Sequence, residues 1–374
     1  MAQASKEAGI EHRTAYKHLD RYPKFAARYR AAVAAQQRTP SDVSSTPAKA
    51  LKRPYSRAMT ATATEPGTPL PAIVICCAEV LGEEFGALLA SVESAAQRPR
   101  PGSPYLAERE EWEASSEHSQ DLWSYGHRMA RGILLNLADH LAMLRKAFSG
   151  PELPLYAHMT LSRVVAEAAA QVCNLIDPEA GYRERVLRAA LLGLRSRTQE
   201  VRAIGSLLDE HPVRRIGALE NTTRAREEFI GLMEKAGLEV RRRVGMPTGA
   251  RYLGDGPFRD LDPKLTLLVN GLFPDRPAGY QIGSGVVHSL EWMLRDAIAS
   301  DGADGVRAEP DLLGMGAATL LALDACAAVA GAYARLYGHD PAPAAEASAR
   351  RCLRVDKACA AEFARVQLLR AAGR

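Results

Sequence analysis

The sequence predicts an all-α protein with a short basic head, a flexible linker and a multi-helix body. Apolar residues recur at intervals of three and four along most of the chain, which is the period of an amphipathic helix. The alternation of β-branched and polar residues that is typical of strands is scarce. With 374 residues, 47% of them hydrophobic and 25% charged, the chain has a globular composition and enough length to bury a sizeable core.

Composition divides the chain into three segments. Residues 1–37, the predicted head, are Ala-rich and helical in character. Residues 38–72 are rich in Pro, Ser, Thr and Ala, and they hold too few large apolar groups to offset the entropy of ordering, so a disordered linker is predicted. Residues 73–374 form the predicted helical body, with its main packed domain at about 105–374.

The body is predicted to be a succession of helices. The longest apolar stripe lies within residues 117–148, where Leu122, Leu137 and Leu144 belong to a series spaced by three and four. Residues 238–262 are irregular and rich in Gly and Arg, with room for a small hairpin, and Gly237 is the expected C-cap of the helix before them. Further helices are predicted at 154–177, 182–209, 218–237, 264–272, 283–299, 312–337 and 343–371.

The stretch from Leu312 to Leu336 is long and apolar enough to resemble a membrane span. It is rich in Ala and Gly, carries Asp324 and has no flanking basic cluster, which favours a buried central helix. The six cysteines form no C-x-x-C pair, so reduced buried thiols are expected. No apolar signal region opens the chain. These features predict a cytoplasmic protein that does not enter a membrane.

The charge is distributed unevenly along the chain. Residues 1–57 hold twelve Lys or Arg and four Asp or Glu, a net charge of +8. The remaining residues hold 36 basic and 40 acidic side chains, a net charge of −4. A polyanion such as DNA would therefore bind at the head.

The segment EAGIEHRTAYKHLDRYPKFAARYRAA, residues 7–32, fits the turn and second helix of a helix-turn-helix. Gly9 tolerates the positive φ that such a turn needs, and HRTAYKHLDRY would form the recognition helix. Arg13 and Lys17 would contact base edges. The full set of expected DNA-contacting residues is Arg13, Thr14, Lys17 and Arg21.

The order AGI-x-x-R-T-A-Y, followed by YPKFAARY, resembles the helix-turn-helix of phage-terminase-small-subunit and transposase-type proteins. The resemblance implies DNA binding by the head. Such domains place another helix before the one that ends at Ala8. Here Met1 falls at the start of the helix that ends at Ala8, so the preceding helix is missing from this sequence. The head is therefore expected to be a truncated helix-turn-helix, which either continues upstream of Met1 or folds with a partner. The alternative is a basic helical tail with no DNA role.

Two features of the body could carry chemistry. Arg163 and Glu167 lie one helical turn apart in an otherwise apolar helix. In GYQIGSGVVHSLEWML, Tyr280, Ser284 and His288 recur every four residues, so a helix would place them on one face. These groups can hold a phosphate or take part in acid–base chemistry. They can equally satisfy one another, and the Arg–Glu pair, inside a helical core.

The helix R-x-x-x-E followed by Y-x-x-x-S-x-x-x-H resembles a broad group of uncharacterised bacterial helical proteins near abortive-infection and HEPN-type families. The resemblance spans roughly residues 118–340 and implies a helical fold and a defence-related context. HEPN ribonucleases use an Arg-x(4–6)-His motif, of which the body has no clear copy. The match from Arg13 to His18 lies inside the expected recognition helix.

The leading hypothesis is a DNA-binding protein, regulatory or associated with a mobile element, whose helical body is an effector or dimerisation module. DNA and a second copy of the chain are the expected partners. One alternative is an enzyme-like domain that acts on RNA or nucleotides around His288, and another is a structural interaction protein. Because no P-loop, dinucleotide fingerprint or H-E-x-x-H motif occurs, no cofactor and no metal are predicted.

Overall fold

The described structure is confined to one part of the chain and is mostly helical. The computed structural model describes residues 69–150, 152–206, 212–262, 264–276, 279–291, 298–300 and 306–371. The chain divides into two units, Met1–Arg57 and Ala58–Arg374, and every described residue belongs to the second. The described residues confirm the predicted all-α class. The predicted head and most of the predicted linker lie outside them.

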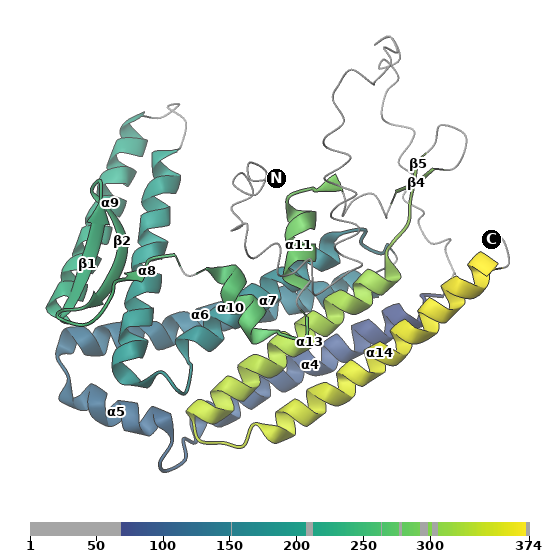
Figure 1. Ribbon diagram of the computed structural model, residues 1–374, viewed down its shortest axis with the longest axis horizontal. Helices are drawn as coiled ribbons and strands as arrows, with labels where there is room; N and C mark the ends of the chain where they lie inside the picture. The colour runs from purple at the N-terminus through teal and green to yellow at the C-terminus, as the bar shows by residue number, and fades with distance from the viewer. Residues whose placement is uncertain are drawn as a thin grey trace, which may run out of the picture. The chain divides into compact units, whose positions relative to one another are not determined.

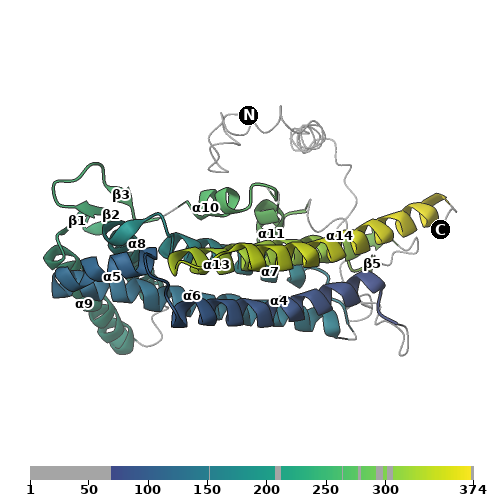
Figure 2. The ribbon, with the colours of Figure 1, turned by 90° about the horizontal axis from the view of Figure 1, so that it is seen from below.

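Five long helices build the first of two cores. Figure 1 shows α4, α13 and α14 side by side, and Figure 2 shows α4 running along α6. Ile73, Leu81 and Leu88 of α4 are fully buried against this core, so packing begins well before the predicted boundary near residue 105. The five helices are α4 (Ala72–Gln97), α6 (Glu117–Ser149), α7 (Ala157–Leu175), α13 (Leu312–Leu336) and α14 (Ala342–Ala371).

Helix α13 is the apolar stretch that resembles a membrane span. It is long and apolar enough to cross a bilayer, yet 67% of its most apolar window is buried within the protein. Asp324 faces the protein as well, since its carboxylate accepts a hydrogen bond of 2.8 Å from Nε of Arg276. The structure thus gives α13 the surroundings of a core helix, as the sequence predicts.

A second core forms where α6 meets α5 (Pro104–Ala114), α8 (Gly181–Gly205) and α9 (Pro212–Lys235). A three-stranded antiparallel sheet covers it, with β1 (Leu238–Arg243), β2 (Met246–Tyr252) and β3 (Arg259–Asp260) in that order. The N-terminal end of α6 supplies Leu122 and Trp123 to this core, whereas its later turns supply Leu137 and Leu144 to the first. One continuous apolar stripe therefore serves two cores.

The expected hairpin after Gly237 is confirmed. Gly237 follows α9 with a φ of +82°, and the two-residue turn between β1 and β2 has positive φ at both Val244 and Gly245. Arg243 pairs with Met246 across this turn. Positive φ at both central residues is the requirement of a type I′ turn, which suits the twist of a tight hairpin.

A buried ion pair joins α5, α6 and α8. Arg185 of α8 and Glu108 of α5 are only 1% and 2% exposed, and their side chains are joined twice, with Nε–Oε2 at 2.6 Å and Nη2–Oε1 at 2.5 Å. Trp123 of α6 donates to the same Oε2 at 3.0 Å. Arg185 also donates to the carbonyl oxygens of Leu175 and Asp177. These bonds hold the turn between α7 and α8 against α5 and α6. They therefore also fix the position of the first turn of α8.

Two histidines, the buried His158 and the partly buried His127, predict how stability depends on pH. Burial lowers the pKa of His127, which lies against Trp123 and Tyr105, to about 3, and burial lowers the pKa of His158 to about 4. Both pKa values lie below the ordinary value of 6.5, so the unfolded chain takes up protons that the folded chain refuses. The free energy of unfolding should therefore fall as the pH drops from 6.5 towards 4, by about 1.4 kcal/mol per pH unit for each histidine.

Urea unfolding between pH 7 and 4.5 measures this slope. The His127→Phe variant keeps an aromatic ring against Trp123 and should reduce the slope by the contribution of one proton. A slope that is unchanged in the variant would show that His127 does not take part.

The segment after α10 (Leu265–Leu272) differs from the prediction. A continuous helix was expected over 283–299, but α11 spans Gly279–Val287. Residues Ile298–Ser300 form strand β4, which pairs with β5 (Val306–Ala308). The helix ends where the chain reverses at Ser289, and backbone N–H groups after the reversal donate to the last carbonyl groups of the helix. Ser289 has a φ of +51°, and its backbone N–H donates to Val286 O. The backbone N–H of Leu290 donates to Gly285 O.

Candidate functional site

Three of the five predicted body residues come together where α7 packs against α11. Nε of Arg163 donates to Oε1 of Glu167 at 2.7 Å, and its Nη2 donates to the hydroxyl of Tyr280 at 3.4 Å. The guanidinium carbon lies 5.0 Å from the centroid of the Tyr280 ring. Burial alone would lower the pKa of Arg163, but Glu167 and Tyr280 outweigh it and raise that pKa. Nη1 of Arg163 is buried without a hydrogen-bond partner.

Close packing at Gly283 explains why α11 can approach Arg163. A Cβ at this position would lie 2.9 Å from Cβ of Arg163 and 3.1 Å from the carbonyl oxygen of Met159. Both distances are shorter than normal contact distances, so a side chain at residue 283 would force the two helices apart. Gly283 therefore has a packing role at this contact.

Ser284 and His288 do not join this group. His288 follows the last residue of α11 and is exposed, and its backbone N–H donates to Ser284 O. Within the described part of the chain, no hydrogen bond or ion pair links either side chain to Arg163, Glu167 or Tyr280. The backbone bond from His288 to Ser284 keeps the helical spacing of four residues, and the chain reverses only at Ser289, so His288 lies at the exposed end of α11.

The predicted DNA contacts Arg13, Thr14, Lys17 and Arg21 lie outside the described residues. Among the described residues, no group of three or more His, Cys, Asp or Glu is placed to hold a metal ion. All six cysteines are free.

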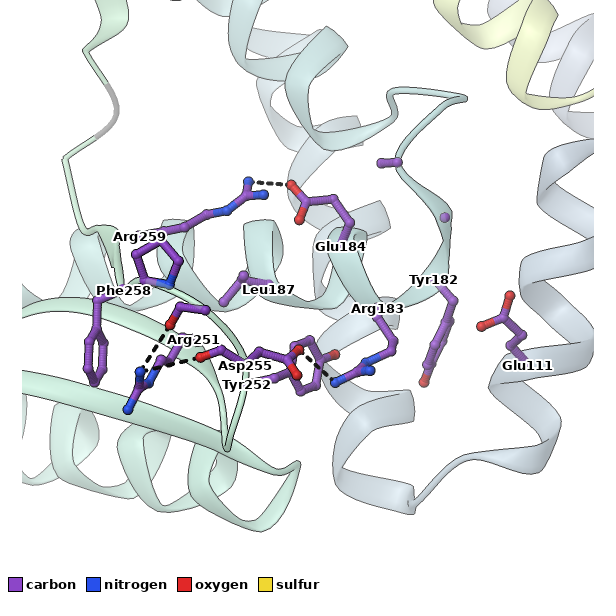
Figure 3. Close-up of a pocket in the computed structure, with 14 residues that line it drawn as sticks. Glu111, Tyr182, Arg183, Glu184, Leu187, Arg251, Tyr252, Asp255, Phe258 and Arg259 are labelled. Atoms are coloured by element: carbon purple, nitrogen blue, oxygen red, sulfur yellow. Dashed lines mark hydrogen bonds and ion pairs between the residues drawn. The ribbon is translucent and has the colours of Figure 1, made fainter.

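A cavity of about 600 Å³ opens between the start of α8 and the end of β2 with the loop that follows (Figure 3). None of the five predicted body residues lines it. Arg183 and Glu184 come from α8, and Arg251, Tyr252 and Arg259 come from β2 and β3. The complete lining is Glu111, Ala180, Gly181, Tyr182, Arg183, Glu184, Leu187, Arg251, Tyr252, Asp255, Gly256, Pro257, Phe258 and Arg259.

Arg183 lies near the middle of this cavity. Its guanidinium carbon is 4.3 Å from the centroid of the Tyr252 ring, and its Nη2 is 3.0 Å from Oδ2 of Asp255. The two side chains of this ion pair are 63% and 57% exposed, so water screens their attraction. Burial, partly opposed by Arg183, raises the pKa of Tyr252 to about 12, so the phenol is neutral at physiological pH.

Arg251 contacts the protein through all three nitrogens of its guanidinium. Its Nε and Nη2 each lie 2.9 Å from Oε2 of Glu239, and its Nη1 donates to the carbonyl oxygens of Asp255 and Gly256. Its guanidinium carbon lies 4.2 Å from the centroid of the Phe258 ring. Arg251 therefore stabilises the loop after β2 and holds Phe258 at the edge of the cavity, as Figure 3 shows.

Arg259 reaches the cavity from β3. Its Nη1 lies 2.5 Å from Oε1 of Glu184. The same carboxylate oxygen accepts from Nε of Arg188 at 2.6 Å. Glu184 thus has two arginine partners, while Arg259 has a single carboxylate partner within the described residues.

Comparison of this chain with protein-family models, with curated proteins and with solved structures gives no significant match.

Sequence reasoning missed the cavity because its residues belong to three segments, Glu111, 180–187 and 251–259, each more than sixty positions from the next. A signal was present in RYLGDGPFRD, residues 251–260, where arginines and aromatic residues alternate with turn-forming glycines. Only the packing of the sheet against α8 brings Arg259 to Glu184. The pairing of these segments cannot be deduced from their spacing.

Proposed function

We propose that this chain is a DNA-binding protein whose basic N-terminal segment contacts the duplex and whose helical body is an effector or dimerisation module. The separation of charge is the observation that carries this proposal. Residues 1–57 have a net charge of +8, and the rest of the chain has a net charge of −4. The division of the chain into two units falls at the same position, between Arg57 and Ala58. A chain that joins a basic unit to an acidic one directs a polyanion to the basic unit.

The local charge density supports contact with phosphates. Residues 11–30 contain six basic and two acidic side chains. Phosphate contacts by Lys and Arg release counterions, which gives affinity that is independent of sequence and sensitive to salt. Arg13 and Lys17 are the proposed base contacts, and Thr14 and Arg21 extend the same surface. A helix that enters the major groove presents such residues from its first turns.

The body supports a binding role better than a catalytic one. Arg163 is bonded to Glu167 and Tyr280, and no described bond joins these residues to Ser284 or His288, the nucleophile and base that acid–base chemistry would need. The proposal places the protein in the cytoplasm and allows a second copy of the chain as a partner of the body.

We expect the full chain to bind duplex DNA of mixed sequence with an affinity that falls steeply between 50 and 200 mM salt, as on the order of six phosphate contacts would require. On DNA of mixed sequence, Arg13 and Lys17 lack their matching base edges and contact phosphates instead, so the Arg13→Ala/Lys17→Ala double variant removes two phosphate contacts. Its affinity should fall at least tenfold, and its salt dependence should lose about two units of slope in a plot of log K against log salt. Fluorescence anisotropy of a labelled duplex measures both quantities.

The matched control removes the same charge from the body. Arg224 and Arg350 are 70% and 72% exposed on helices α9 and α14. The Arg224→Ala/Arg350→Ala variant should bind DNA within twofold of the parent chain. Equal losses in both variants, or binding that survives the first, would remove the N-terminal segment from the proposed function.

The contact between α7 and α11 favours a second candidate function. The buried Nη1 of Arg163 has no partner, and a guanidinium beside a phenol can bind a phosphodiester oxygen. This is the expected setting of an RNA- or nucleotide-acting domain. Because His288 is exposed beyond the end of α11, such a domain would have to work without the predicted imidazole. This function is therefore the weaker candidate.

A further inference from the structure

We propose that the cavity between α8 and the β2–β3 loop binds a small molecule that carries both a phosphate group and a planar ring, as nucleotides do. The proposal goes beyond DNA binding and does not depend on the N-terminal segment. The cavity volume of about 600 Å³ suits a ligand of nucleotide size.

Two arginines with spare donors reach the cavity from opposite sides. Arg183 uses Nη2 for Asp255, and Arg259 uses Nη1 for Glu184. Each guanidinium has five N–H donors in a planar fork. Donors therefore remain on both side chains, and each guanidinium can donate to the oxygens of a phosphate in the cavity.

Releasing these arginines to a ligand costs little. The Arg183–Asp255 pair is more than half exposed on both sides, and such pairs contribute little to stability. Glu184 keeps its bond of 2.6 Å to Arg188 when Arg259 turns away. In the free protein, the charges of Arg183 and Arg259 are balanced by Asp255 and Glu184. A bound phosphate would replace both carboxylates as partners of these arginines. Asp255 would then turn to solvent, and Glu184 would keep Arg188.

The first turn of α8 adds to the attraction for an anion. Ala180, the N-cap residue, makes no side-chain capping bond, and Ala180 and Gly181 both line the cavity. The free N–H groups of a helix start carry partial positive charge. The buried Arg185–Glu108 pair fixes this turn in place, so the site is preorganised at its base.

Aromatic and acidic groups at the edges select the rest of the ligand. Figure 3 shows Phe258 and Arg251 at one edge and Glu111 beside Tyr182 at the other, with Arg183 between them. The guanidiniums of Arg251 and Arg241 lie 4.2 and 5.5 Å from the centroid of the Phe258 ring, so a ligand ring would meet the edge of Phe258 and stack on the plane of Arg183. Glu111 is exposed, so its carboxylate can accept hydrogen bonds from the exocyclic amine of a nucleobase.

The test is a calorimetric titration of the full chain with AMP and GMP, with adenosine, inorganic phosphate and benzoate as comparison probes. We expect a nucleoside monophosphate to bind at least tenfold more tightly than either adenosine or phosphate alone. The Arg183→Ala and Arg259→Ala variants should each weaken binding at least tenfold. The Arg224→Ala variant removes an exposed arginine of α9, outside the cavity, and should bind like the parent chain.

Each of the other outcomes overturns the proposal. Adenosine binding as tightly as AMP would remove the phosphate requirement, and benzoate binding in preference to AMP would replace phosphate by carboxylate. Absence of binding by all probes, or binding that both arginine variants preserve, would show that the cavity is not the site. Thermal unfolding of both variants, expected to match the parent chain, separates lost binding from lost folding. DNA binding by the same samples reports independently on the N-terminal segment.

Discussion

Replacing Glu108 by Ala should reduce the free energy of unfolding by about 3–5 kcal/mol, the largest single effect expected in this protein. The substitution leaves the guanidinium of Arg185, which is 1% exposed, with carbonyl partners and no counter-charge. It also removes the acceptor of the indole N–H of Trp123. A buried charge that has lost its partner keeps its full desolvation cost. Urea unfolding at pH 7 measures the difference.

Two further variants separate the charge from the packing. Glu113→Ala removes another acid from α5, but its ion pair with Arg109 is 3.6 Å long and mostly exposed, so the expected loss is below about 1 kcal/mol. The Glu108→Leu/Arg185→Met double variant replaces the whole pair by apolar side chains and should recover most of the stability lost in Glu108→Ala. A double variant that is no more stable than Glu108→Ala would show that the pair acts through geometry and not through charge.

Replacing Gly193 by Ala should destabilise the second core by about 1–3 kcal/mol. A Cβ at this position of α8 would lie 2.8 Å from Cε1 of Phe229 and 3.0 Å from Cε1 of Tyr125. The Phe229 ring cannot easily move away, because it is buried and the guanidinium of Arg197 covers it at 4.0 Å from the ring centroid. The clash therefore outweighs the helix propensity that alanine gains over glycine, about 1 kcal/mol.

Gly231→Ala is the matched control in α9. A Cβ at Gly231 meets no atom within 4 Å, so only the gain in helix propensity remains and the variant should be more stable than the parent. Thermal unfolding of the two variants should therefore shift in opposite directions. Equal shifts of one sign would mean that the contact with Phe229 is not tight.

The helices of the body were predictable because their signals are local. The apolar stripe over 117–148 matches α6 at Glu117–Ser149, and the stretch from Leu312 matches α13 at Leu312–Leu336. Gly237 marked the end of a helix for a local reason, the positive φ that its position requires. Periodicity and terminal residues act within a few positions of one another, so they can be recognised without knowledge of the fold.

The candidate site was only partly predictable. The contact of Tyr280 with Arg163 could be anticipated, because each residue is a polar group in an otherwise apolar helix and needs a partner when the helices pack. The end of α11 depends on the positive φ of Ser289, a conformation that serine rarely adopts and that its local sequence did not indicate. His288 keeps its helical bond to Ser284, but it lies at this exposed end of the helix.

The sequence by itself determined the helical class, the positions of most helices and the separation of a basic segment from an acidic body. Only the tertiary structure decided that α6 is shared by two cores, that Glu108 is buried while Glu111 is exposed, and that Arg183 and Arg259 reach one cavity. Charge and periodicity are properties of neighbouring residues and are visible in the chain. Burial and convergence depend on which distant segment packs on which face, and that is settled by the whole core at once.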